Sequence, residues 1–173
     1  MSMAEVLAIS TLAERYRQRS HAYAVMGTLP IPDSARMAPE HLVRLCEAAI
    51  AGRVLYPHDK LERWCGYIEA MLVPLNAARL HIPLSCRLDE QLIILGYSVS
   101  GVHVSTAPHH DGGDIQEMCR QILKVPVTAL SHRNIGFVQG ALATAGWIDV
   151  DTERDFSRPL LHAIHSRAIP TFS

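Results

Sequence analysis

The chain has 173 residues, of which 49% are hydrophobic and 19% charged, and its formal net charge is -1 with the histidines neutral. A chain this apolar buries a core of its own, which excludes global disorder. The near-zero charge argues against bulk nucleic acid or an anionic membrane as a partner. The N-terminal stretch lacks a basic region, and Ser10 and Glu14 interrupt its apolar residues. We therefore expect neither a signal peptide nor a membrane span there.

The number and spacing of the cysteines limit the kinds of metal site that the chain can form and indicate its cellular compartment. Four cysteines stand at positions 46, 65, 86 and 119, with no CxxC motif. Zinc-ribbon sites need paired ligands a few residues apart, so this spacing excludes them. Cys46, Cys65 and Cys119 fall on apolar faces of expected helices and are interpreted as small core residues. Four free thiols favour a reducing cytoplasm.

Two stretches of the chain resemble each other. A helix over residues 5–25 and a proline-rich connection come first. Then "RWCGYIEAML", which begins at Arg63, recurs as "RNIGFVQGAL", which begins at Arg133. An amphipathic helix precedes each copy, "HLVRLCEAAI" and "DIQEMCRQIL", with apolar residues at i, i+3, i+4 and i+7. Asp59 and Asp114 are placed as N-caps of helices. Such internal similarity predicts two related helical modules.

The sequence therefore predicts one all-α domain over residues 1–173, a helical bundle with an internal duplication. Its expected parts are the N-terminal helix 5–25, module one 38–96, a linker 97–113 and module two 114–167. Residues 86–95 and 152–164 are expected to supply a third helix to each module, with Pro159 opening or kinking the second. A pair of strands stays open as the alternative for residues 92–104, because they are rich in β-branched residues.

The glycines of the repeated stretch ask for a physical reason, because glycine inside a helix costs roughly 1 kcal/mol relative to alanine. Small residues recur at matched positions of the two central helices: Gly66, Ala70, Gly136 and Gly140. Small residues four apart form a flat strip that lets two helix backbones approach closely. We predict that the two strips face each other across a pseudo-twofold axis. The alternative is that each glycine accommodates a bulky neighbour such as Trp64 or Trp147.

Arg63 and Arg133 also recur at the same position of the repeat. One interpretation makes them paired anchors for an acidic surface of a protein partner. The alternative is that each arginine buries its apolar stem and forms a salt bridge with a neighbouring helix.

Histidines offer the strongest hint of chemistry. "HHDGGD" brings His109, His110 and Asp111 together, and His-Asp pairs ligate the catalytic metal in phosphohydrolases of the HD type. The alternative is a polar loop with helix caps, which the neighbouring glycines favour. His162 and His165 stand three apart on a helix and could share a metal, but no third ligand is indicated. We assign no catalytic residue, metal or cofactor.

The stretch "IGFVQGALATAGWIDVDTERDFSRPLLHAIH" and, less closely, "HDKLERWCGYIEAML" carry a recurring pattern. It consists of an Arg-x-x-Gly-aromatic-aliphatic-Gln helix, a glycine turn, an acidic stretch and Arg-Pro-Leu. With this pattern the chain resembles short uncharacterised helical proteins encoded by tailed bacteriophages and prophages. The first copy departs from it, with Glu69 in place of the Gln and Ala70 in place of the second Gly. The resemblance implies a phage setting and no mechanism.

No serine-hydrolase or phosphate-loop motif occurs in the sequence. We therefore predict a non-enzymatic, cytoplasmic interaction protein. With the resemblance, this becomes a phage-encoded accessory protein or inhibitor that binds a host protein complex. The alternative is a metal-dependent phosphohydrolase that uses His109, His110 and Asp111. The identity of the partner and the formation of a homodimer stay open.

Overall fold

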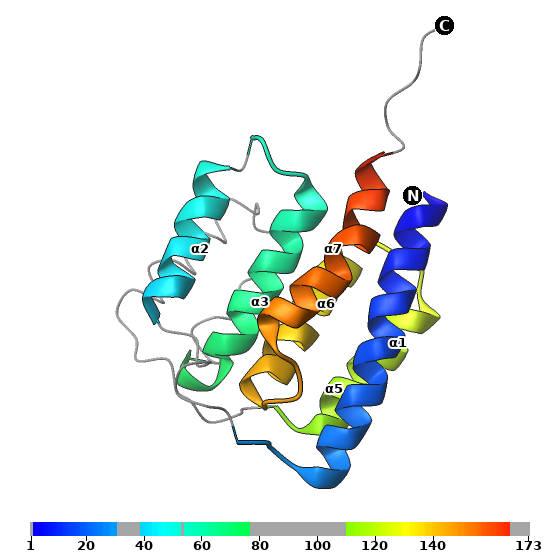
Figure 1. The fold of residues 1–173 in the computed structure, drawn as a ribbon, viewed down its shortest axis with the longest axis vertical. Coiled ribbons are helices and arrows are strands. Elements are labelled where there is room, and N and C mark those ends of the chain that lie inside the picture. Colours follow the sequence, from blue (N-terminus) through cyan, green and yellow to red (C-terminus); the bar gives the residue numbers. More distant parts are fainter. Residues whose placement is uncertain (1, 31–38, 53, 77–109, 167–173) are drawn as a thin grey trace, which may run out of the picture.

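The computed structural model of the chain describes residues 2–30, 39–52, 54–76 and 110–166 (Figure 1). Over these ranges the chain forms helices and no strand, which confirms the predicted all-α class. The helices are α1 (Met3–Met26), α2 (Pro39–Ala51), α3 (His58–Asn76), α5 (Gly112–Lys124), α6 (Ala129–Thr144) and α7 (Val150–Ser166). The helix expected at 86–95 and the strand pair weighed for 92–104 lie outside the described residues.

Helix α1 begins slightly before the predicted residue 5 because a capping box closes its first turn. The Ser2 hydroxyl accepts from the Glu5 amide at 3.1 Å, and the Glu5 carboxylate accepts from the Ser2 amide at 3.4 Å. Both bonds satisfy donors that a helix N-terminus otherwise leaves free. Among the helices described, none combines the length and the apolar character that crossing a lipid bilayer requires.

Both predicted N-caps, Asp59 and Asp114, are wrong. Helix α5 starts at Gly112, and its cap is Asp111, whose side chain accepts from the Gly113 amide at 2.6 Å. Helix α5 therefore begins two residues before the predicted module two, and Asp114 lies in its first turn. Helix α3 starts at His58, so Asp59 also lies inside its helix. Its carboxylate accepts a hydrogen bond from Arg63, one turn later, instead of capping the backbone. Sequence alone leaves such a choice open, because any acidic residue near a helix start fits the pattern.

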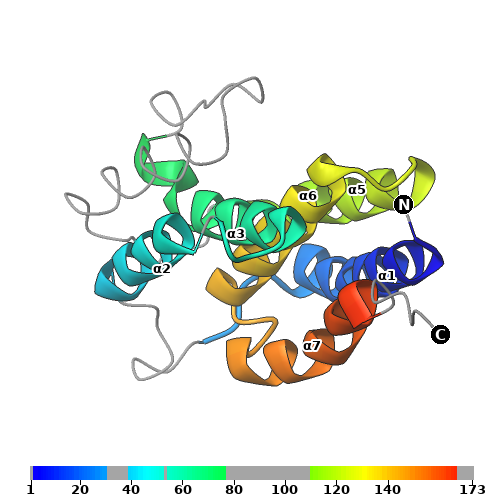
Figure 2. The same ribbon diagram turned by 90° about the horizontal axis from the view of Figure 1, so that it is seen from above.

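Helices α3 and α6 cross at the centre of the molecule (Figure 2). Helix α1 runs antiparallel to α5, with Gly112 so near α1 that a Cβ there would lie 2.4 Å from the Ala24 nitrogen. Helix α7 packs on α1, and Pro159 lies within α7 instead of opening it. Helix α2 lies beside α3 on the opposite side of the molecule from α1 (Figure 2).

The buried apolar side chains of the described residues form two clusters. The larger cluster joins α1, α5 and α6, and its bulkiest members include Ile9, Leu12, Tyr16, Ile115, Ile135 and Leu142. The smaller one joins α2 and α3 through Leu42, Cys46, Ala49, Leu61, Cys65, Tyr67, Ile68 and Met71. The two clusters meet at the crossing of α3 and α6, where Ala70 of α3 belongs to the larger cluster and Ala143 of α6 packs on both. A common origin of the two modules stays a prediction, since the last part of module one is outside the described residues.

Candidate functional site

The crossing of α3 and α6 brings two helix backbones into direct contact. A Cβ on Gly66 would lie 1.9 Å from the Arg133 carbonyl oxygen, and a Cβ on Gly136 would lie 1.9 Å from that of Arg63. The two contacts are reciprocal, so the helices are related here by a local pseudo-twofold axis. No side chain larger than hydrogen fits at either position, since the obstacle is backbone that cannot rotate away.

The second pair of small residues continues the contact one turn later. A Cβ on Gly140 would lie 2.7 Å from the Tyr67 carbonyl oxygen and 3.0 Å from the Ala70 Cβ. All four small residues singled out in the sequence thus lie at this crossing, strip against strip. Trp64 and Trp147 are not among the atoms nearest to these glycines.

A buried chain of charged groups lies beside the crossing and links three helices. The Nε2 atom of His132 on α6 is 2.9 Å from the Glu5 carboxylate on α1. Its Nδ1 atom is 2.8 Å from a guanidinium nitrogen of Arg63 on α3, which also donates to Asp59 at 2.7 Å. The side chain of His132 is 1% exposed and that of Arg63 10%. Burial at this level requires that each polar atom find a partner inside the protein.

The partners of His132 determine its protonation state. Arginine only donates hydrogen bonds, so Nδ1 must accept, and the single ring proton lies on Nε2, where it is donated to Glu5. The imidazole is therefore neutral. Burial first, and then the positive charge of Arg63, lower the pKa of His132 below its usual value, although the Glu5 hydrogen bond opposes them.

Asp59 connects this chain of charges to α7. The Nε2 atom of His165 lies 3.3 Å from the Asp59 carboxylate, and the His165 side chain is 43% exposed. Burial opposes ionisation of Asp59, but the hydrogen bond and charge of Arg63 outweigh it, and the pKa of Asp59 is lowered. His162 is also exposed on α7.

Arg133 forms the second ion pair of the crossing. It is 5% exposed, and its Nε atom donates to the Glu69 carboxylate on α3 at 3.1 Å. Arg63 and Arg133 thus both lie inside the protein and face carboxylates of α3. For Arg133 this is the arrangement of the second interpretation, a salt bridge with a neighbouring helix, whereas Arg63 forms its salt bridge with Asp59 of its own helix. Anchors for a partner would need guanidinium groups at the surface, whereas Arg63 and Arg133 are 9% and 5% exposed.

The histidine-rich segment is described from His110 onward, and its side chains have structural partners. His110 Nε2 lies 3.3 Å from the Ala70 carbonyl oxygen, and the ring meets Phe137 edge-on at 4.8 Å. The Tyr23 hydroxyl donates to the His110 carbonyl oxygen. Burial lowers the pKa of His110. Within the described ranges, no three His, Cys, Asp or Glu side chains are grouped closely enough to hold a metal ion. His109 lies outside those ranges.

The cap assigned to Asp111 can be tested by two substitutions at that position. Asp111→Ala removes the acceptor for the Gly113 amide, so we expect a loss of about 1 kcal/mol in the free energy of unfolding. Asp111→Asn keeps an equally good cap and should cost much less. Urea denaturation measures both. If Asp111 instead held a metal, excess zinc or manganese would raise the melting temperature of the wild type, and both variants would lose that rise.

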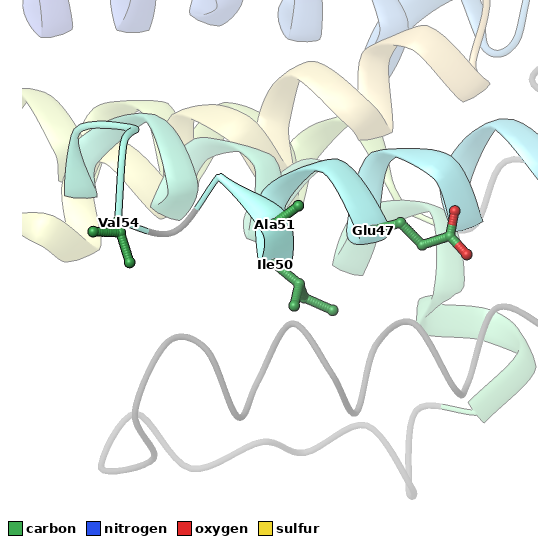
Figure 3. A pocket seen from close by; sticks show the side chains of 4 residues that line it. All are labelled: Glu47, Ile50, Ala51 and Val54. Carbon is green, nitrogen blue, oxygen red and sulfur yellow. The ribbon is translucent and has the colours of Figure 1, made fainter.

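A pocket of about 370 Å³ lies on α2 and the turn after it (Figure 3). Glu47, Ile50, Ala51 and Val54 line it. Among the described residues, the lining thus consists of one carboxylate and three apolar side chains, which provide neither a partner group for acid–base catalysis nor a set of metal ligands. We assign no ligand to this pocket.

Cys46, Cys65 and Cys119 are buried in the core, as interpreted from the sequence. Burial raises the pKa of Cys46 to about 11 and that of Cys65 to about 12. The thiolate is the reactive form, so neither side chain is equipped as a nucleophile.

The chain was compared with models of protein families, with curated proteins and with solved structures, and nothing matches. The resemblance to phage-encoded helical proteins therefore stays a prediction.

Sequence reasoning missed Glu5, His132 and Glu69, which complete the buried ion pairs. His132 directly precedes Arg133, and Glu69 lies three residues after Gly66. A signal was available, because polar residues that neighbour a predicted backbone contact are themselves expected to be buried. The sequence still could not pair them, since Glu5 and His132 stand 127 residues apart.

Proposed function

We propose that this chain is a non-enzymatic helical interaction protein that binds a protein partner through one end of its bundle. The proposal rests on four exposed apolar side chains, here called the apolar end: Met3, Leu7, Val125 and Leu130. Their exposed fractions are 79%, 63%, 54% and 44%. Large apolar side chains held in water in one region are typical of protein interaction sites.

The four side chains belong to elements that meet at the same end of the molecule. Met3 and Leu7 stand four residues apart on the first turns of α1 and so share a face. Val125 and Leu130 belong to the connection of α5 and α6 and to the first turn of α6. The contact of Glu5 with His132 at 2.9 Å joins the start of α1 to the start of α6. Figure 2 likewise shows the N-terminus beside the α5–α6 connection.

The partner that suits this end is a protein with an apolar surface rather than a charged polymer. The chain carries a formal net charge of -1, so electrostatic attraction contributes little. With the phage resemblance, the proposal becomes a phage-encoded accessory protein or inhibitor that acts on a host protein complex in the cytoplasm. The His109-His110-Asp111 phosphohydrolase stays the weaker alternative, because His110 and Asp111 already have structural partners.

A pair of matched variants tests the proposal. Leu7→Glu places a charge at the apolar end, and Leu55→Glu places one in the α2–α3 connection, where Leu55 is 82% exposed. A bacterial protein captured by the wild type should bind Leu7→Glu at least about tenfold more weakly, since an unpaired charge in an interface costs more than about 1.4 kcal/mol. Binding to Leu55→Glu should be unchanged. Isothermal titration with the captured protein measures both.

Three results would contradict the proposal. Equal binding of the partner to both variants would mean that the apolar end is not the contact. Light scattering that shows a wild-type dimer, converted to a monomer by Leu7→Glu alone, would identify a second copy as the occupant. Phosphatase activity that requires added metal and is lost in His110→Gln would favour the enzyme.

A further inference from the structure

The joint between the two cores is built differently from the cores themselves. The α1–α5–α6 cluster and the α2–α3 cluster are each held by large aliphatic side chains. Where α3 crosses α6, glycines bring the two backbones into contact, and Ala143 of α6 packs on both clusters. The polar contacts of Arg63 and Arg133 lie beside the backbones. The polar groups of this crossing are buried, so leaving one of them without its partner is costly, and a change of charge there acts directly on the contact between α3 and α6.

His132 lies at this joint, and charged groups face it from the packed helices. Glu5 faces it from α1, and Arg63 and Asp59 face it from α3. Tyr16 of α1 lies near Arg63, and His165 of α7 reaches Asp59 at 3.3 Å. Among the described residues, Arg63 is the group that makes a neutral imidazole necessary, because it donates to Nδ1.

We propose that His132 makes the α3–α6 joint a switch that acid opens. A proton from solvent that binds Nδ1 places an N–H group against a guanidinium N–H at 2.8 Å, so two donors and two positive charges meet. Nε2–H keeps its bond to Glu5, and Arg63 keeps Asp59 within α3. The contact between α3 and α6 is the one lost. Helix α3 then packs less firmly on α6, while the contacts of α6 with α1 and α5 are kept.

The sign of the pH dependence follows from the direction in which the pKa moves. An unfolded chain protonates histidine near pH 6.5. The folded protein does so at lower pH, because burial and Arg63 lower the pKa of His132. Between these two values the open state binds more protons than the closed state. Stability of the joint is therefore fully present above about pH 6.5 and is lost as the pH falls from there through the folded pKa.

His110 provides a matched comparison at the same joint. Burial lowers its pKa too, and its Nε2 atom bonds Ala70 of α3 at 3.3 Å. Ala70 offers a carbonyl oxygen, which accepts a hydrogen bond from either protonation state of the ring. Protonation of His110 thus costs desolvation but breaks no contact. If burial alone determined the effect of acid on the joint, protonation of His110 and of His132 would weaken it equally.

Hydrogen exchange followed by mass spectrometry tests the switch in the intact chain, from about pH 7.5 to about pH 5, a range that brackets the usual histidine pKa of about 6.5. After correction for intrinsic exchange rates, protection of α3 and α6 near Gly66 and Gly136 should fall as the pH drops. The fall should be about tenfold for each pH unit that separates the pKa of folded His132 from that of a free histidine. Protection of α1 and α5 should change much less.

Two variants separate the switch from general acid sensitivity. His132→Asn keeps an acceptor for Arg63 and takes up no proton, so the fall in protection should disappear. His110→Gln should retain it, because protonation of His110 breaks no contact in the wild type.

A second readout uses the wild type alone and does not depend on the variants folding. NMR titration of the ring protons should give His132 a pKa below about 6.5. Opening of α3 and α6 should follow the same titration curve. A His132 pKa at the ordinary value, a loss of protection that spreads equally over α1 and α5, or a loss that persists in His132→Asn would each overturn the proposal.

Discussion

Gly136→Ala is expected to destabilise the protein by about 3 kcal/mol or more. The added methyl group would lie 1.9 Å from the Arg63 carbonyl oxygen and 2.7 Å from its carbonyl carbon. These are backbone atoms, so relief requires the two helices to move apart, and overpacking of this kind costs about 1–3 kcal/mol or more. The better helix propensity of alanine opposes the loss by at most about 1 kcal/mol. Urea denaturation measures the difference.

Other glycines supply a graded series of controls. Gly140→Ala should cost less than Gly136→Ala, because its nearest obstacle is 2.7 Å away. Gly113→Ala meets only a side-chain oxygen of Asp111 at 2.9 Å, so it should be close to neutral. Gly66→Ala should match Gly136→Ala, and the double variant should cost less than the sum, since one separation of the helices relieves both clashes. A higher melting temperature for Gly136→Ala would contradict the close crossing.

Arg15→Met is expected to destabilise the protein by about 2 kcal/mol. The Arg15 Nε atom lies 3.0 Å from both oxygens of Glu153, which is 1% exposed, and its guanidinium lies 4.0 Å from the centre of the Phe156 ring. The substitution leaves a carboxylate in the interior without its cation. Breaking a fully buried pair costs about 3–5 kcal/mol, and we expect less here because the Arg15 side chain is 26% exposed. Urea denaturation and hydrogen exchange in α7 measure the effect.

Arg17→Met on the same helix is the control. Arg17 pairs with Glu14 at 2.7 Å, but the two side chains are 34% and 42% exposed. The hydrogen bonds from Arg17 and Gln18 lower the pKa of Glu14 to about 2, yet water solvates both partners when the pair is broken. We expect little change in stability. A loss equal to that of Arg15→Met would mean that burial of Glu153 does not determine the cost.

The sequence by itself determined the class and the central contact. Apolar residues spaced at 3.6-residue periods predict helices, and the structure confirms the all-α class. The four small residues form one flat strip on each of two helices. A flat strip leaves room for another helix backbone to approach closely. Local rules of this kind depend on neighbours within a turn or two, which a sequence displays directly.

Only the tertiary structure decided what the charged residues do. The sequence of Arg63 and its neighbours fits both a surface anchor and a buried ion-pair partner. Contacts from other helices decide between these roles, because His132 of α6 bonds Arg63 and Glu5 of α1 bonds His132. The same holds for Arg133 and Glu69, 64 residues apart. Asp59 and Asp111 show the same limit at short range, because an acidic residue near a helix start can cap the backbone or bind a side chain. A charged group that is buried must have a partner inside the protein, and this determines which interaction it makes. Whether it is buried depends on how the helices assemble rather than on any one segment.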